Sequence, residues 1–332
     1  MNLDFHKNHR LLYGVIFFGF IFLTLIIAVG PALWVQDHNE PIPGSRPLTA
    51  QQKRGLDLYV AEGCLYCHTQ QVRPLDVDKP FGRPSAPGDY ARLGPLDLWR
   101  MTPEMLGTER NGPDLSNVAE RQSSETWNYI HLYDPRAVVK GSVMQAYHWL
   151  FVVKRTPGPN DVVVPVPPEY APKGGKVVAT EKAKDLVAYL LSLRQTTLPG
   201  SAARASQVPA SAKPPAAPAP GAPLYAARCA SCHQPDGEGI PGVFPPLKGD
   251  PVVTAKNPTH HIEIVLAGLH GKTINGVKYA AAMPAHEHSM TDAEIAAVVN
   301  HERTSWGNNA PTVTEQDVAK VRAREEREES HH

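Results

Sequence analysis

The sequence predicts a mostly α-helical membrane protein in which one N-terminal transmembrane helix precedes two similar domains. First, the segment from Leu11 to Gln36 contains no charged residue. Second, a C-x-x-C-H pattern occurs twice, at residues 64–68 and 229–233. Third, both copies follow a predicted helix and precede a Pro-containing loop, a methionine loop and a closing amphipathic helix. This repeated order indicates two copies of one architecture.

The N-terminal apolar segment is long enough to cross a bilayer. Leu11 to Val29 is almost wholly apolar, and such a run spans the hydrocarbon core as a helix. Lys7 and Arg10 precede it and acidic residues follow it, so the positive-inside rule places residues 1–10 in the cytoplasm. We therefore predict a retained anchor over residues 11–35. A cleaved signal peptide is the alternative, but the run is longer than a usual signal core.

The two C-x-x-C-H motifs predict two covalently bound haem c groups. In this chemistry the thiols add across the haem vinyl groups and the adjacent histidine ligates the iron. Zinc or a redox dithiol is the alternative for a lone C-x-x-C, but the chain has only four cysteines and the motifs use all of them. The predicted attachment residues are Cys64, Cys67, Cys229 and Cys232, and the predicted iron ligands are His68 and His233.

Haem c attachment supports the predicted topology independently. In bacteria this attachment takes place on the outer face of the cytoplasmic membrane. The sequence therefore predicts a single-pass protein of the bacterial inner membrane, with its N-terminus cytoplasmic and both haem domains periplasmic.

Composition divides the rest of the chain. We predict a Pro-rich spacer, a first haem domain with a loop insertion, an Ala/Pro-rich linker, a second haem domain and a charged tail, at residues 36–49, 50–196, 197–221, 222–309 and 310–332. Helices are expected at 51–62, 124–132, 182–194 and 292–303. Residues 69–107 form the insertion, a long loop of the kind that often serves function. A helix in the tail is expected to be solvated.

Each haem iron needs a second axial ligand, and methionine is the predicted one. Met283 precedes the closing helix of the second domain, and Met144 holds the matching place in the first. Met101 and Met105 lie in the insertion and are expected to be packing or contact residues. Histidine ligation is the rival, with candidates His131, His148, His260, His261, His270, His286 and His288.

Four further residues are candidates for contacts around the haems. Pro113 and Pro245 follow the two motifs in loops whose carbonyls are expected to accept from the second ring nitrogen of each proximal histidine. Arg73 and Arg136 have the donor fork that suits haem propionates. Surface ion pairs are the alternative for both arginines.

Two resemblances follow from these motifs. The second domain is similar to a class I bacterial cytochrome c. The segments that carry this similarity are Cys229–His233, Phe244–Leu247, Met283–Ala285 and Ser305–Asn308. The first domain resembles the membrane-anchored monohaem subunit of cbb3-type cytochrome c oxidases. The segments that carry this resemblance are Glu62–Cys64, His68–Pro74, Gly112–Leu115, His131 to Arg136 and Met144 to Leu150. The resemblances imply a mostly α fold, with an N-terminal transmembrane helix followed by two cytochrome c-type haem domains. The fused second domain departs from the monohaem family.

The oxidase resemblance implies a function and its partners. The subunit would pass electrons from a periplasmic cytochrome or copper-protein donor, through the second haem and then the first, to a membrane catalytic subunit with haem b and copper. The alternatives are the cytochrome c subunit of a nitric oxide reductase, a membrane-tethered electron shuttle and a dihaem peroxidase. With 33 basic and 33 acidic residues, nothing in the charge marks a nucleic-acid binder, and no nucleotide-binding motif is present.

Overall fold

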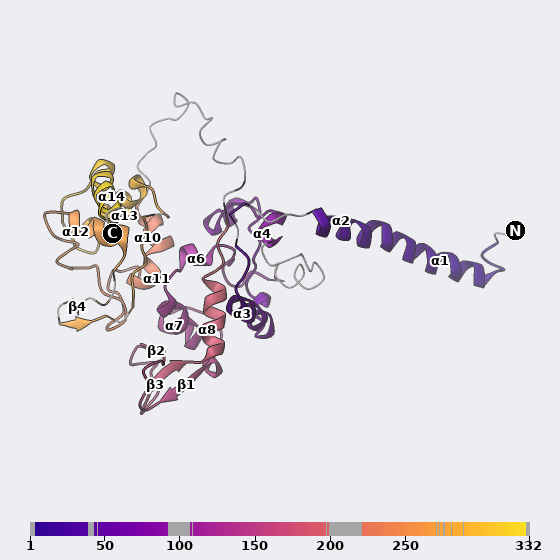
Figure 1. Cartoon of the computed structure of the whole chain (residues 1–332), viewed down its shortest axis with the longest axis horizontal. Helices are drawn as coiled ribbons and strands as arrows, with labels where there is room; N and C mark the ends of the chain where they lie inside the picture. Colours follow the sequence, from indigo (N-terminus) through magenta and orange to yellow (C-terminus); the bar gives the residue numbers. More distant parts are fainter. Residues whose placement is uncertain are drawn as a thin grey trace, which may run out of the picture.

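The computed structural model shows two lobes and one helix that projects away from them (Figure 1). It describes residues 4–38, 43–44, 46–91, 107, 109–196, 198, 221–269, 271, 273–274, 276–279, 281–287 and 289–329. Most of the predicted linker, the second part of the insertion with Met101 and Met105, and the rival ligands His270 and His288 lie outside these residues.

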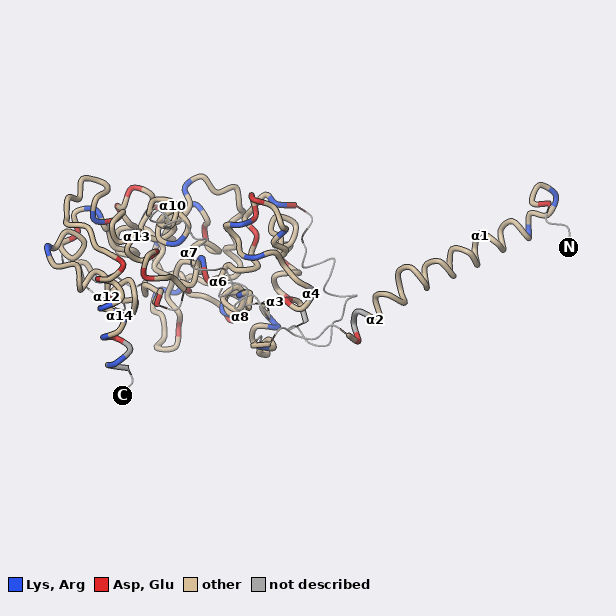
Figure 2. The backbone as a smooth tube through the Cα atoms, turned by 90° about the horizontal axis from the view of Figure 1, so that it is seen from above, with Lys and Arg blue, Asp and Glu red and all other residues tan. Residues whose placement is uncertain are grey.

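The projecting helix is the predicted anchor. It consists of α1 (His9–Thr24), a π-helical turn (Leu25–Val29) and α2 (Gly30–His38). Within the described residues it is the one helix long and apolar enough to cross a membrane, over His9–Trp34, and none of that window is buried. Figure 2 shows charged residues only near its two ends. Length and composition thus identify a candidate membrane span.

Two crossing helices organise the first lobe. They are α3 (Ala50–Ala61), which a capping box at Thr49 starts, and α8 (Glu181–Leu190). A Cβ atom at Gly55 would lie 2.0 Å from the Asp185 carbonyl oxygen, so only glycine permits this approach of the two backbones. The shorter helices between them are η2 (Cys64–Tyr66), η3 (Asp76–Phe81), α4 (Pro87–Ala91), α6 (Val118–Arg121), α7 (Glu125–Tyr133), η4 (Pro135–Ala137) and η5 (His148–Leu150).

A small antiparallel sheet, which the sequence analysis did not predict, precedes α8. Its order is β1-β3-β2, from β1 (Phe151–Lys154), β2 (Val163–Val164) and β3 (Lys176–Ala179), with Phe151 opposite Ala179. The strands have only two to four residues, and irregular segments separate them. Alternation over so few residues gives no reliable strand signal, so packing against the lobe defines this sheet.

The second lobe repeats the crossing of a first and a last helix. Here α10 (Gly221–Arg228) packs on α13 (Asp292–Thr304), and a Cβ atom at Gly221 would lie 2.1 Å from the Ala297 carbonyl oxygen. The motif helix α11 (Ala230–His233), helix α12 (Thr259–Ala267) and the hairpin of β4 (Thr273–Ile274) and β5 (Val277–Lys278) lie between them.

The charged tail is not a solvated helix, and this corrects the expectation from its composition. Helix α14 (Glu315–Glu329) packs on α12 and α13. Val318 is fully buried and Val321 nearly so, within the same cluster as Ile262 and Ile295. Two apolar positions three residues apart on one face dock the helix, together with ion pairs from Arg322 to Asp292 and from Arg324 to Glu263.

Candidate functional site

Both C-x-x-C-H motifs have the same backbone turn. In the first, the His68 amide donates to the Cys64 carbonyl at 3.0 Å, and in the second the His233 amide donates to the Cys229 carbonyl at 3.0 Å. This turn puts both thiols and the imidazole of each motif along one short stretch of helix. Within the described residues, no group of three or more His, Cys, Asp or Glu side chains is arranged to hold a metal ion, as a zinc site would require.

The two motif histidines are oriented in the same way. His68 Nδ1 lies 2.8 Å from the Pro113 carbonyl oxygen, and His233 Nδ1 lies 2.9 Å from the Pro245 carbonyl oxygen. A carbonyl only accepts, so Nδ1 carries the proton and Nε2 keeps the lone pair that a metal needs. Burial lowers the pKa of both imidazoles, which favours this neutral form.

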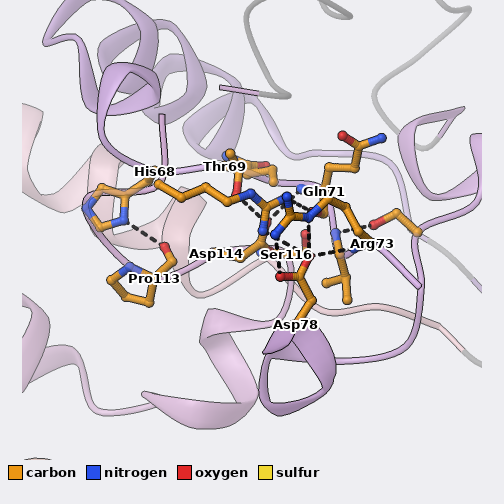
Figure 3. Close-up of polar contacts among 12 residues, drawn as sticks. His68, Thr69, Gln71, Arg73, Asp78, Pro113, Asp114 and Ser116 are labelled. Carbon is orange, nitrogen blue, oxygen red and sulfur yellow. Dashed lines mark hydrogen bonds and ion pairs between the residues drawn. The ribbon is translucent and has the colours of Figure 1, made fainter. Parts of the chain in front are cut away.

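A polar network holds the loop beneath His68 (Figure 3). The Asp114 carboxylate, which is buried, accepts from the Thr69 hydroxyl at 2.6 Å and from the Gln71 amide at 2.8 Å. Gly112 lies against the imidazole, because a Cβ there would be 2.3 Å from His68 Cε1. The sequence analysis quoted Asp114 as part of a motif but assigned it no role. Its position directly after Pro113 was the available signal.

The second motif opens into an apolar pocket. Apolar side chains form most of its lining, including Phe244, Val265 and Leu269. Its lining includes the predicted attachment and ligand residues Cys229, Cys232, His233, Pro245 and Met283. The structure therefore brings together, around one cavity, predicted residues that span more than 50 positions of the sequence.

The two methionine loops are held by backbone contacts. Met283 pairs with Leu269 through two hydrogen bonds of 2.8 and 3.1 Å. In the first lobe Met144 is partly buried against the same apolar cluster as Cys64, and its carbonyl accepts from Arg136 Nη1 at 3.1 Å. Arg136 also pairs with Asp134 at 3.1 Å. In this structure Arg136 thus positions the methionine loop.

His131 is a rival ligand that the structure places close enough to His68 for the two imidazoles to interact electrostatically. Its ring stacks on Trp127, with centroids 4.4 Å apart, and its Nδ1 atom is buried without a hydrogen-bond partner among the described residues. Burial, with a smaller contribution from nearby His68, lowers the pKa of His131 to about 4. Met144 therefore stays a prediction, with His131 as its alternative.

The remaining predicted site residue, Arg73, is placed in an ion pair. Arg73 Nε and Nη2 donate to the two Asp78 carboxylate oxygens at 2.8 and 2.9 Å. Arg110 donates to the same carboxylate at 3.0 Å. The Arg73 hydrogen bond is the main cause that holds the pKa of Asp78 well below its usual range. Arg73 is therefore engaged in an ion pair, as the alternative proposed, but the carboxylate partner is buried and does not lie at the surface.

Two arginines that the sequence analysis did not select line the pocket of the second lobe. Arg228 directly precedes Cys229, whereas Arg121 comes from the end of α6 in the first lobe. Gln122 and Ser123 accompany Arg121 in this lining. Proximity to the motif could have identified Arg228. Arg121 gave no sequence signal, because more than 100 residues separate it from the motif it faces.

The lobes also meet directly beside the second motif. Trp127 Nε1 donates to the carbonyl of Ser231, between the two motif cysteines, at 2.9 Å. Phe244 and Val243 of the second lobe belong to the same apolar cluster as the core of the first. The second motif therefore faces the first lobe (Figure 1).

Comparison with known proteins agrees with this geometry. Residues 4–157 match the family described as "Cytochrome C oxidase, mono-heme subunit/FixO", and residues 218–306 match "Cytochrome c". Cytochrome c-552 of Thermus thermophilus is 40% identical over 107 residues, which are 30% of this chain and 81% of that protein. The chain belongs to the cytochrome c family.

Other relatives of this cytochrome c are subunits of dehydrogenases. The cytochrome c subunit of alcohol dehydrogenase (quinone) from Gluconacetobacter polyoxogenes is 46% identical over 99 residues, which are 30% of this chain. The gluconate 2-dehydrogenase cytochrome c subunit of Pantoea cypripedii is 39% identical over 101 residues. The chain spans only 21% and 23% of the lengths of these two subunits.

Together, the fold and the comparisons identify a chain with two cytochrome c-type domains. The fused arrangement predicted from the motifs is confirmed, as is the mostly helical fold with an apolar N-terminal helix and two cytochrome c-type domains. Cytochrome c domains carry covalently bound haem c, and the residues of the second pocket fit that group. The pocket is apolar, two thiols and a neutral imidazole line it, and two buried arginine nitrogens lack partners among the described residues.

Proposed function

We propose that this cytochrome c is the electron-entry subunit of a cbb3-type haem–copper oxidase. It carries two haem c groups, attached at Cys64 and Cys67 and at Cys229 and Cys232, with His68 and His233 as proximal ligands. Met144 and Met283 are the proposed distal ligands. Haem iron supplies one-electron transfer. Electrons from a periplasmic donor enter at the second site, continue to the first and leave to the catalytic subunit.

One observation carries the proposal. The match to the mono-haem oxidase subunit is continuous from residue 4 to residue 157, so it includes the candidate span, the first motif and Met144. A single unburied helix joined to a haem domain suits a subunit that is held beside a membrane-embedded partner. That family implies a complex with a catalytic subunit, and the haem b and copper of the partner are part of our proposal.

The topology of the proposal follows from the charges around the span. Lys7 lies before the candidate span, Arg10 lies at its start and Asp37 lies after it. By the positive-inside rule we propose a cytoplasmic N-terminus and periplasmic haem domains at a bacterial inner membrane. Fusing a labelling tag to either end and testing its accessibility in intact spheroplasts checks this arrangement, and a tag at the N-terminus that reacts from outside would contradict it.

The direct experiment is purification of the full chain from gently solubilised membranes, followed by mass spectrometry and by haem and metal analysis. We expect a large partner with haem b and copper. A partner with haem b and non-haem iron would identify a nitric oxide reductase instead. A free dihaem chain would favour the tethered shuttle, and peroxide turnover by that chain with one high-spin haem would favour a peroxidase.

A second candidate rests on the relatives of the second domain. Its 46% identity to the cytochrome c subunit of a quinone-dependent alcohol dehydrogenase favours a dehydrogenase-linked electron carrier. Co-purification with a dehydrogenase, and no copper in the complex, would replace the oxidase proposal with this one.

A further inference from the structure

The haem pocket of the second domain is completed by the first domain. Arg121, Gln122 and Ser123 line this pocket together with Arg228 and the second motif. Arg121 Nε and Arg228 Nη1 are buried, and neither has a hydrogen-bond partner among the described residues. Buried guanidinium groups normally have their donors satisfied, so two incomplete ones at one cavity indicate an anionic ligand.

Contacts within the first domain hold the Arg121 side chain in this place. Its Nη2 atom donates to the Asp114 carbonyl oxygen, and its guanidinium carbon lies 5.1 Å from the centre of the Phe81 ring. These contacts occupy one edge and one face of the guanidinium group and leave Nε free. Asp114 belongs to the loop that orients His68, so the position of Arg121 is tied to the first haem site.

The electrostatics of the pair also favour an anionic ligand. Burial lowers the pKa of Arg121, the Asp114 carboxylate partly offsets this, and the neighbouring Arg228 lowers the pKa further. Asp250 and Glu302 are the carboxylates in the pocket lining. Two like charges inside an apolar pocket repel each other, and each loses hydration. A ligand with two carboxylates would offset both costs through charge-assisted hydrogen bonds.

We propose that Arg121 and Arg228 bind the propionate carboxylates of the haem attached at Cys229 and Cys232. The second haem site is therefore shared between the two domains, and the haem itself helps to hold them together. This inference rests on the proposed function only in requiring a haem at the second motif. It does not depend on whether the partner is an oxidase.

The interface supports this sharing of the site. Trp127 donates to the Ser231 carbonyl, and the apolar contacts of Phe244 continue into the core of the first domain. Arg121 lies six residues before Trp127, and both residues contact the second domain beside its motif. Docking at Trp127 thus brings Arg121 over the pocket, and the propionates give the docked state an additional ionic contact.

The test uses the full chain with both haems attached, and it compares Arg121→Gln, Arg121→Lys and Arg228→Gln. Arg324→Gln is the matched control. It removes one positive charge from the second domain, but Arg324 pairs with Glu263 and does not line the pocket. Peptide mass spectrometry first counts the haem on each motif. Spectroelectrochemical titration then gives the midpoint potential of each haem between pH 5 and 9.

We expect each glutamine variant to shift the reduction equilibrium of the second haem at least tenfold toward the oxidised form. For a one-electron couple, a tenfold shift lowers the midpoint potential by 59 mV. The potential should also become dependent on pH, because a propionate without its arginine takes up a proton when the haem is reduced. Arg121→Lys keeps the charge and should fall between the wild type and Arg121→Gln.

An unchanged potential at a fully loaded second haem, in the variants of both arginines, would overturn the proposal. A shift confined to the first haem would overturn it as well, because Arg121 would then serve the other site. If a glutamine variant loses its haem, the midpoint potential of the second haem in Arg121→Lys provides the test instead. A wild-type second motif without haem would instead overturn the two-haem assignment, and the first measurement detects that case separately.

Discussion

The two haem domains share a skeleton but differ in what surrounds it. Each crosses its first and last helices at a glycine, Gly55 or Gly221, and each orients its motif histidine with a proline carbonyl. The first domain adds a sheet and a polar network around Asp78. The second domain adds α14, and residues of the first domain line part of its pocket. The shared parts serve the haem, and the additions determine what each domain contacts.

The largest expected contrast comes from removing one haem at a time. Replacing Cys64 and Cys67 with alanine should abolish electron delivery to the partner, since the first haem is the proposed exit. Replacing Cys229 and Cys232 should block the physiological donor but leave the first haem reducible by a small artificial reductant. Haem-stained gels and oxygen uptake by membranes measure both effects. Equal loss with the artificial reductant would contradict the proposed order.

The loop beneath the first histidine gives the next largest effect. Gly112→Ala would place a Cβ atom 2.3 Å from His68 Cε1, so the imidazole must move away from Pro113. We expect a loss of about 1–3 kcal/mol in unfolding free energy, with a shifted spectrum for the first haem only. Denaturant titration and absorption spectroscopy measure these changes.

The control for that variant is Gly141→Ala in the same domain, where an added Cβ atom meets nothing within 4 Å. It should change the unfolding free energy by less than about 0.5 kcal/mol. An unshifted first haem in Gly112→Ala would show that this loop does not position His68.

Helix α14 distinguishes the second domain from the first. Val318→Ala removes two methyl groups from a fully buried position and should cost about 1–3 kcal/mol of unfolding free energy. Val143→Ala, at a position 89% exposed in the first domain, is the comparison and should be nearly neutral. Thermal unfolding followed by the Soret band measures both. Equal stability of the two variants would show that α14 is a solvated surface helix and does not pack on the domain.

The polar network of the first domain predicts a smaller, pH-dependent effect. The folded-state pKa of Asp78 is depressed, mainly by its hydrogen bond with Arg73, so its stabilisation is fully present above the unfolded value of about 4. It is lost as the pH falls through the folded pKa. Asp78→Asn should therefore destabilise the domain at pH 7, and this difference should shrink in acid below about pH 4.

The matched variant for that comparison is Asp76→Asn. Asp76 also pairs with a cation, Lys79, but its side chain is 93% exposed. Exposed pairs contribute little, so its unfolding curve should follow the wild type at every pH. Stability differences of similar size in both variants would show that the buried network has no special contribution.

The sequence alone was sufficient wherever the chemistry is local. The spacing within Cys64–His68 and Cys229–His233 predicts haem attachment, and the uncharged run after Leu11 predicts a span by its length. The helices at 51–62, 124–132 and 292–303 were found within one residue at each end, because caps such as Thr291 and continuous apolar faces mark them. The proline carbonyl contacts followed from the same order of elements.

Only the tertiary structure decided the contacts between distant segments. Arg121 reaches a motif more than 100 residues away, Val318 docks a helix that composition alone describes as charged, and β3 pairs with strands too short to give a pattern. Such contacts depend on which faces pack together, and packing is a property of the folded surfaces. Spacing within the chain therefore identifies the haem-attachment chemistry, while the partnership between the two haem domains appears only once the chain has folded.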